Sequence, residues 1–192
     1  WMFSPGENAC MWSECVAKGQ MYLGWDDMGD LSLYESREQM RSKMKEIYGS
    51  DKNYMNDSLA TWEFVNELSV GDIVYAKKGR YCIVGRGVVT GEYLYDATRD
   101  RSMNVKAVRW ELTGEWQTTE AHVMKTLTEI TQYHNYLQKL DTLVNGGIVP
   151  EENCRYWWLC ANPKVWSIAE WPIGEEQEYT LFNENGHKRR IF

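Results

Sequence analysis

The chain has 192 residues, a formal net charge of -7, ten Trp and twelve Tyr. This length suffices for one large domain, or for one ordinary domain and part of another. The negative net charge disfavours a protein that is basic all over, as many nonspecific nucleic-acid binders are. The aromatic residues exceed what a core of this size needs, so we expect some of them to line a pocket.

Several functional classes lack support in the sequence. The five Cys form no CxxC pair, which predicts reduced thiols, and the three His are too far apart to predict a zinc site. There is no signal peptide and no apolar run long enough to cross a membrane, so we expect a cytoplasmic protein. We find no P-loop and no arrangement of catalytic side chains, so we predict no enzymatic activity and no cofactor or metal.

The first third of the chain predicts short strands alternating with helices. A strand over 1–4 leads into a helix over 7–18 that Gly19 ends, and a second strand covers 20–24. The acidic residues Asp26, Asp27 and Asp30 follow, and we interpret them as turn residues rather than as ligands of a divalent ion.

Two further helices precede the central part of the chain. Ser36 and Gln39 form a capping box, which predicts a helix that runs to Tyr48. We expect a polar linker over 52–57 and then a third helix, whose apolar face includes Leu59, Trp62, Val65 and Leu68.

The clearest motif of the chain lies between Gly71 and Asp96. The runs 73–75 and 81–84 flank Lys78-Gly79, which predicts a hairpin with a tight turn. Gly85 and Gly87 predict a bulge or sharp bend, followed by another strand over 88–95. These strands together predict a small barrel.

Past residue 96 we expect a strand over 105–112 and a long amphipathic helix from Leu127 to Val144. His134 lies on the apolar stripe of that helix and is interpreted as a packing residue. The segment YWWLCANPKVWSI, after Pro150, repeats the pattern of WMFSPGENACMW at the start of the chain. We interpret it as the beginning of a second, incomplete copy of the first module.

The charge distribution predicts a local site for a polyanion. Between Lys77 and Arg109 the sequence has eight basic and three acidic residues. Such a basic segment is typical of a phosphate-binding edge, although a solvated sheet edge has the same composition.

The segments FVNELSVGDIVYAKKGR, IVGRGVVTGEYLYDATRD and VRWEL resemble the EVE-like domains of the PUA superfamily that begin McrB-type modification-dependent restriction proteins. RYWWLCANPKVW resembles the start of a second such domain. The resemblance implies an α+β fold, a small PUA-like β-barrel flanked by helices. It also implies three regions: an EVE-like domain over 1–116, a helical connector over 117–150, and the start of a second EVE-like domain over 151–192.

The same resemblance implies a function and its partners. Such domains bind modified double-stranded DNA and hold a flipped base, for example a methylated cytosine, in an aromatic pocket. An AAA+ GTPase or ATPase motor and a nuclease act on other domains or subunits. By similarity to the related YTH readers, the pocket would comprise Asn8, Trp25, Asp26, Tyr93, Tyr95 and Asp96.

Basic side chains of the central segment would then contact phosphates, namely Lys77, Lys78, Arg80, Arg99 and Arg101. Each pocket residue also has an ordinary structural role open to it: Trp25 closing one barrel end, Asn8 capping the first helix, and Tyr95 packing on an edge strand. For the whole chain, the alternatives are a structural or protein-interaction domain and an RNA-binding PUA-like domain.

Overall fold

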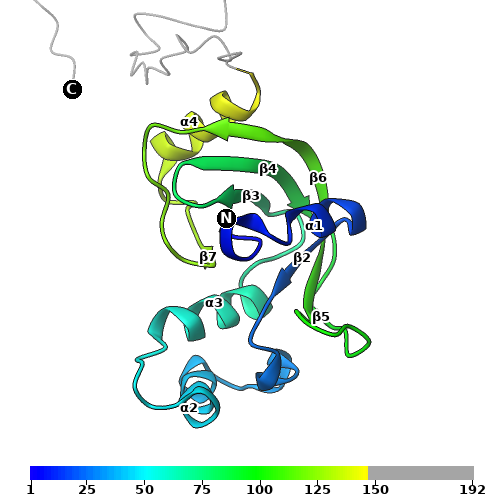
Figure 1. Ribbon diagram of the computed structural model, residues 1–192, viewed down its shortest axis with the longest axis vertical. Coiled ribbons are helices and arrows are strands. Elements are labelled where there is room, and N and C mark those ends of the chain that lie inside the picture. Colours follow the sequence, from blue (N-terminus) through cyan, green and yellow to red (C-terminus); the bar gives the residue numbers. More distant parts are fainter. Residues whose placement is uncertain (147–192) are drawn as a thin grey trace, which may run out of the picture. The chain divides into compact units, whose positions relative to one another are not determined.

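The computed structural model describes residues 1–146, which form an α+β fold of seven strands and four α-helices (Figure 1). The strands are β1 (Met2–Phe3), β2 (Gln20–Leu23), β3 (Ile73–Lys78), β4 (Cys82–Val89), β5 (Leu94–Tyr95), β6 (Asn104–Gln117) and β7 (Leu127–Thr128). The helices are α1 (Trp12–Lys18), α2 (Arg37–Tyr48), α3 (Met55–Asn66) and α4 (His134–Val144), with short 3-10 turns at Glu7–Ala9, Asp26–Met28 and Leu31–Leu33. The expected second module over 151–192 lies outside the described residues.

The strands form one mixed sheet in the order β2-β6-β4-β3-β1-β7, with β5 paired to β6. Strand β1 runs parallel to β3, and the other pairs are antiparallel. The long strand β6 pairs with β2 over 104–107 and with β4 over 108–117, so it joins two parts of a bent sheet (Figure 1). Within residues 1–146 the pairing does not return from β7 to β2, so the closed barrel predicted from the sequence is not found.

The hairpin of β3 and β4 is confirmed, with Gly79 at φ +63° in its turn. The bulge predicted at Gly85 and Gly87 is confirmed, since the pairing of β4 with β6 shifts register at both glycines. The separate strand predicted over 88–95 is wrong, because β4 continues to Val89 and is followed by the two-residue strand β5. A Cβ on Gly85 would lie 2.3 Å from the ring of Trp12. The glycine therefore gives an aromatic ring room to lie against the strand, and the register shifts leave the strand intact.

Two hydrophobic clusters cover the sheet. The larger one joins the strands to α2 and α3 through residues such as Phe3, Met40 and Phe64. The smaller one packs Leu140 and Val144 of α4 against Met2, Tyr75 and Ile83. The hydroxyl of Tyr75 donates to Asp141, and Arg86 Nε donates to the same carboxylate at 3.2 Å, which attaches α4 to β3 and β4.

These contacts correct the expectations for residues 117–150. The long helix predicted from Leu127 begins only at His134, because residues 127–128 pair with β1 as strand β7. Since β7 belongs to the main sheet and α4 packs on it, residues 117–146 are part of the first domain rather than a separate helical connector.

The ends of the other helices were predicted correctly in some places and not in others. Ser36 Oγ accepts from Gln39 N–H at 3.2 Å, which confirms the start of α2, and Gly19 ends α1 at φ +61°. The linker predicted over 52–57 is too long, since α3 already begins at Met55. None of the helices in residues 1–146 combines the length and apolar character needed to cross a lipid bilayer.

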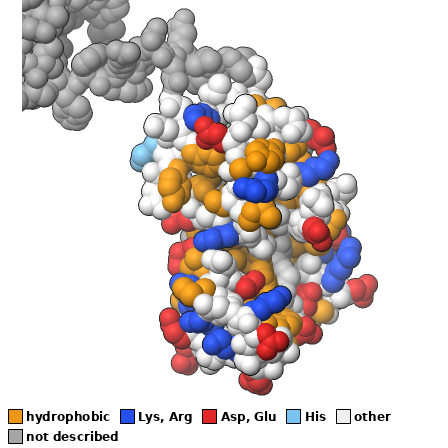
Figure 2. Space-filling model, turned by 60° about the vertical axis from the view of Figure 1, so that its left-hand side comes forward, with side chains coloured by type: hydrophobic (Ala, Val, Ile, Leu, Met, Phe, Trp, Pro, Cys, Tyr) orange, Lys and Arg blue, Asp and Glu red, His pale blue; other side chains and the backbone are white. Residues whose placement is uncertain are grey.

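The surface has a mixed character. Figure 2 shows one face of the molecule, on which hydrophobic, basic and acidic side chains lie close together. Among the exposed apolar residues are Tyr81, in the turn between β3 and β4, and Met124, in the loop before β7. The turn is joined to this loop by two backbone hydrogen bonds, from Thr118 N–H to Tyr81 O and from His122 N–H to Arg80 O.

Candidate pocket beside the sheet

A pocket of about 500 Å³ lies where the ends of β2 and β3 meet the segment after β1 and the loop before β7. Its volume falls within the range of small-molecule and cofactor sites, roughly 300–1,000 Å³. Its lining includes Asn8, Met11, Tyr22, Trp25, Lys77 and Ser102.

Two residues predicted from the sequence, Asn8 and Trp25, line this pocket together. They come from turns on different sides of α1, and the fold joins them because β2 follows α1 directly. The structure adds a second aromatic residue to the lining, Tyr22, which the sequence did not predict. Its position in a short strand gave no sign of which face would be open.

Three residues that line the pocket have a left-handed backbone conformation, with positive φ. The φ angles are +50° for Asn8, +65° for Trp25 and +52° for Ser102. Only two other non-glycine residues in the described chain, Ala9 and Tyr54, have positive φ, and Ala9 is the neighbour of Asn8. Left-handed conformations cost free energy in non-glycine residues and tend to cluster at functional sites, which supports this pocket as the site.

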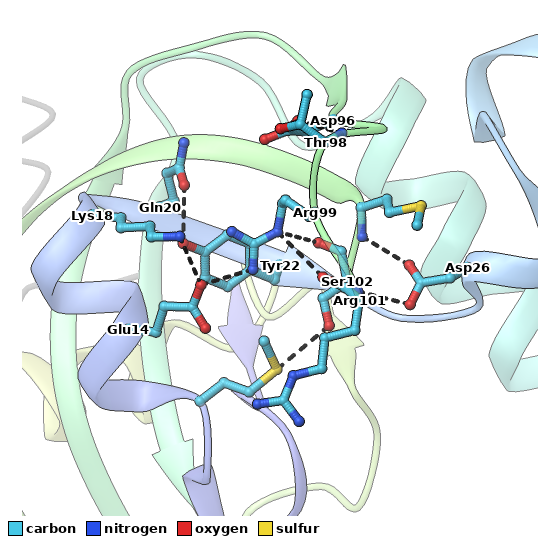
Figure 3. A network of polar contacts seen from close by, with 12 residues as sticks. Glu14, Lys18, Gln20, Tyr22, Asp26, Asp96, Thr98, Arg99, Arg101 and Ser102 are labelled. Carbon is cyan, nitrogen blue, oxygen red and sulfur yellow. Dashed lines mark hydrogen bonds and ion pairs between the residues drawn. The ribbon is translucent and has the colours of Figure 1, made fainter.

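Tyr22 is held from behind by a charged group. The guanidinium of Arg99 lies 4.0 Å from the centre of its ring, and its hydroxyl donates to Gln20 Oε1 at 2.9 Å (Figure 3). Glu14 accepts from the same guanidinium at 2.9 Å. Arg99 thus orients an aromatic wall of the pocket. Because its guanidinium is paired with Glu14, it is not free to make the phosphate contact predicted from the sequence.

Asp26 contributes to the pocket indirectly. Its carboxylate accepts from the N–H groups of Ser102 and Met103 at 2.7 and 2.8 Å (Figure 3). Arg99 Nε donates to Ser102 O at 3.0 Å. These bonds fix Ser102 in its left-handed conformation at the pocket wall, so Asp26 is a positioning residue and not part of the lining.

The structure does not bring the three residues from 93–96 into the pocket. Tyr93 lies between helix and sheet: its hydroxyl accepts from Leu31 N–H at 2.9 Å and lies 2.7 Å from Asn104 Oδ1. Burial raises its pKa. The hydroxyl of Tyr95 contacts Met103 Sδ at 3.2 Å, and the carboxylate of Asp96 accepts from Thr98 N–H at 3.1 Å, so both serve the local loop.

Lys77 lines the pocket but is almost fully buried, with 4% of its surface exposed. Within residues 1–146 its ammonium forms no hydrogen bond and no ion pair, and it is not among the buried side-chain atoms left without a partner, so it reaches the open space of the pocket. Burial lowers the pKa of this lysine. Lys125, on the opposite loop, adds a second, half-buried cation to the lining.

The other predicted phosphate contacts divide into two groups. Lys78 is exposed, and its ammonium pairs with Glu115 at 2.7 Å. Arg80 and Arg101 are exposed neighbours of the pocket-lining residues Gly79 and Ser102, and neither forms an ion pair within residues 1–146. The guanidinium of Arg80 lies 5.9 Å from the centre of the Tyr81 ring, and Arg101 lines a second cavity beside Glu14 and Arg99.

The acidic cluster after β2 acts in turns. Asp30 Oδ1 accepts from Ser32 N–H at 2.9 Å and so caps a 3-10 turn, as the sequence predicted. In the described part of the chain, no group of three or more His, Cys, Asp or Glu side chains is arranged to hold a metal ion.

Comparison with protein families gives a match over residues 1–135 to the family described as Domain of unknown function (DUF8426). The chain belongs to this family. Every pocket-lining residue, from Ser4 to Thr126, falls within the DUF8426 match, so the pocket is formed by the family's own domain. Neither the curated proteins nor the solved structures contain a match to the chain.

Proposed function

We propose that this DUF8426 domain recognises a modified base in DNA, held flipped out of the duplex in the pocket of Asn8, Tyr22 and Trp25. The observation that carries the proposal is the pocket itself. It has about 500 Å³ of space, two aromatic side chains and three residues with left-handed backbone. A flat, polar-edged ligand such as a nucleobase fits this chemistry, because aromatic faces stack the base and polar groups read its edge.

Energetic considerations support the aromatic wall as the main source of binding. Extruding a base costs a few kcal/mol, and stacking on an aromatic side chain returns about 1–3 kcal/mol per base. A single methyl group contributes only about 1 kcal/mol on burial. Preference for a modified base therefore requires a closely fitting wall, which Arg99 behind Tyr22 and Asp26 behind Ser102 help to keep in place.

The proposal includes the EVE-like assignment and its cellular setting. The sequence resemblance supports a PUA-related reader from a McrB-type restriction system, with an open bent sheet in place of a closed barrel. In that setting the domain is cytoplasmic and non-enzymatic, and an AAA+ motor and a nuclease on other domains or subunits act after recognition. Arg80 and Arg101, which are exposed and form no ion pair in the described residues, contact the DNA phosphates.

The test is a comparison of the native chain with Trp25→Ala on duplexes that differ only in one modified base. We expect the native chain to bind the modified duplex more tightly, and the variant to lose that preference by about tenfold, since one stacking face is removed. Trp62→Ala is a matched control, because Trp62 lies on α3, packs against the core and does not line the pocket.

Thermal unfolding followed by circular dichroism checks that both variants retain the fold. Equal affinity of the native chain for modified and plain DNA would contradict the proposal. Competition with RNA of the same sequence separates DNA reading from an RNA-binding role, and absence of binding to either nucleic acid would favour a protein-interaction domain.

A further inference from the structure

We propose that Lys125 alternates between the pocket and Glu63, so that the pocket binds an anionic group of the phosphate-ester type together with a proton on Glu63. The inference goes beyond the proposed function, because it concerns the charge and the pH dependence of the pocket and not the base that the pocket holds. Its test requires no DNA.

The first observation is an excess of positive charge in the lining of the pocket. Lys77 and Lys125 line it, and Glu7, which is exposed, is the one acidic residue in the lining. Within residues 1–146 neither lysine forms an ion pair. A concave site with charge of one sign concentrates ligands of the opposite sign, so this lining favours an anion.

The second observation is a pair of buried oxygen atoms that lack a donor. Glu63 of α3 is 8% exposed, and its Oε2 atom has no hydrogen-bond partner in the described residues. The hydroxyl of Thr128, on β7, is also buried there without a partner. Because α3 packs against β7, two neighbouring elements each carry a polar atom that the described chain leaves unsatisfied.

Lys125 links the pocket to this pair of oxygen atoms. It lies three positions before Thr128, and its positive charge acts on Glu63, whose pKa it lowers against the larger effect of burial. The neighbouring backbone is fixed, since Ser4 N–H donates to Thr126 O at 2.8 Å. The lysine side chain itself is flexible and carries three donors, so its ammonium turns from the pocket to the carboxyl group without movement of the backbone.

The charges around Glu63 determine the position of this ammonium. Burial, Glu67 on the same helix and Glu129 after β7 raise the pKa of Glu63, while Lys125 and Arg37 lower it, and the result is about 7. Below that pH the carboxyl group is neutral and leaves the ammonium to the pocket. Above it, a buried carboxylate without a donor is costly, and pairing with the ammonium removes that cost.

The sign of the linkage follows from this competition. An anion in the pocket draws Lys125 away from Glu63, which raises the pKa of Glu63 and makes the protein take up a proton on binding. Anion affinity is therefore highest below about pH 7 and falls as pH rises through that value. A phosphate ester suits the site, because its oxygen atoms accept charge-assisted hydrogen bonds from an ammonium.

The experiment uses sulfate as the probe, since its charge does not change between about pH 6.5 and pH 8.5. Nuclear magnetic resonance follows binding to the full chain through the backbone amides of Lys125 and Thr126. We expect the native chain to bind sulfate about five- to tenfold more weakly at the higher pH, the equivalent of roughly one charge-assisted hydrogen bond. Glu63→Gln should bind sulfate equally at both, because the side chain no longer ionises.

Two further variants test the role of the shared cation. Lys125→Gln should weaken sulfate binding at pH 6.5 and abolish its pH dependence, and it should raise the pH at which the Glu63 carboxyl carbon titrates, without any ligand present. Lys125→Arg keeps the cation and should restore the pH dependence. Lys45→Gln is the matched control, since Lys45 is exposed, lies on α2 and does not line the pocket.

His122, in the loop before β7, is the other buried group that titrates near this range. Burial, and then the charge of Lys77, lower the pKa of His122 below its usual 6.5, so the imidazole is neutral throughout the experiment. A native chain that binds no sulfate at either pH overturns the anion site. A pH dependence that persists in folded Glu63→Gln overturns the coupling.

The same titration with a duplex carrying a modified base distinguishes two sources of the phosphate ester. A fall in affinity with pH that Glu63→Gln abolishes assigns the anion to the DNA backbone. A pH effect on sulfate alone assigns it to a free phosphorylated molecule. Equal binding of modified and plain DNA contradicts the proposed function and leaves the result with sulfate standing.

Discussion

Glu63, on α3, is an ionisable residue in an unfavourable environment. It is 8% exposed, and its Oε2 atom has no hydrogen-bond partner in the described residues. Burial, and then the negative charge of Glu67, raise the pKa of Glu63 to about 7. The carboxyl group therefore ionises in the folded protein only near neutral pH, well above its range in an unfolded chain.

This raised pKa predicts a pH dependence of stability. The folded state holds the proton of Glu63 more tightly than the unfolded state does. The stability that this protonated group contributes is therefore complete below about pH 4.5 and is lost as pH rises to about 7. Glu63→Gln removes a charge that is unfavourable in this buried position at pH 8. It should raise the free energy of unfolding at that pH by about 1–2 kcal/mol, a modest value because water screens part of the charge. Urea unfolding of both proteins from pH 5 to pH 8 measures this difference.

The comparison isolates Glu63 from a second buried group. Burial, and then the charge of Lys77, lower the pKa of His122, so its contribution has the opposite sign and is lost as pH falls below about 6.5. His122 titrates in both proteins and cancels in their difference. Glu38→Gln, an exposed change on α2, is the control, because the charge of Glu38 is not among those that shift the pKa of Glu63. A stability difference that stays constant from pH 5 to pH 8 would refute the role assigned to Glu63.

Single residues of the site were predictable only where a local motif or the family resemblance placed them. Asn8 and Trp25 were assigned to a pocket through the resemblance to YTH readers, and the structure brings both residues into one pocket. Tyr93 was assigned to the pocket, but its hydroxyl bonds with Leu31 and Asn104 point it into the core. Which side of a strand is open depends on distant elements, so no local pattern reveals it.

At the scale of elements, the close packing of α1 against β4 is a specific feature of this fold. Trp12 of α1 lies over Gly85 of β4 and meets Trp110 of β6 edge to face, with ring centres 4.7 Å apart. Trp110 Nε1 also donates to Cys15 O at 3.0 Å. The absence of one side chain on β4 thus positions α1, and with it the turn that holds Asn8.

Gly85→Ala should destabilise the protein by about 1–3 kcal/mol, the usual cost of overpacking, because the new Cβ would lie 2.3 Å from the Trp12 ring. Chemical unfolding measures the change. Gly24→Ala is the control, since a Cβ there would meet nothing within 4 Å and its effect should stay below about 1 kcal/mol. Equal stability of the two variants would show that Trp12 can move without cost.

Elements with strong local signals were predicted well, and those fixed by long-range pairing were not. The hairpin around Gly79 and the cap at Ser36 follow from turn and capping chemistry that acts over a few residues. Strand β7 has two residues and exists because it pairs with β1, more than 120 positions earlier in the chain. Its apolar residues continue the stripe of α4, so the sequence pattern alone favoured one long helix.

At the scale of the whole molecule, the basic segment between Lys77 and Arg109 is largely neutralised within the fold. Four of its eight basic residues form ion pairs, Lys78, Arg86, Arg99 and Arg109, while Lys77 and Lys106 are buried. Of these eight, Arg80 and Arg101 are exposed and form no ion pair in the described residues. The excess of positive charge read from the sequence therefore overstates what a DNA backbone would meet.

This count predicts a weak dependence of DNA affinity on salt. Two phosphate contacts on B-DNA correspond to a slope of about -1.8 in a plot of log affinity against log salt concentration. The negative net charge of -7 adds a general repulsion, so affinity should come mainly from the pocket. Arg80→Gln and Arg101→Gln should each reduce the slope by about 1 while leaving the preference for modified DNA intact, because phosphate contacts position the protein without reading sequence.

Titrations between 50 and 300 mM salt give the slope for each protein. Arg109→Gln serves as the control, since its guanidinium pairs with Glu111 at 2.8 Å and should not be available to a phosphate. A slope steeper than about -4 in the native chain would mean that the paired basic residues exchange their carboxylates for phosphates on binding. A slope near the expected value, abolished in the double variant of Arg80 and Arg101, would locate the DNA backbone beside these two arginines.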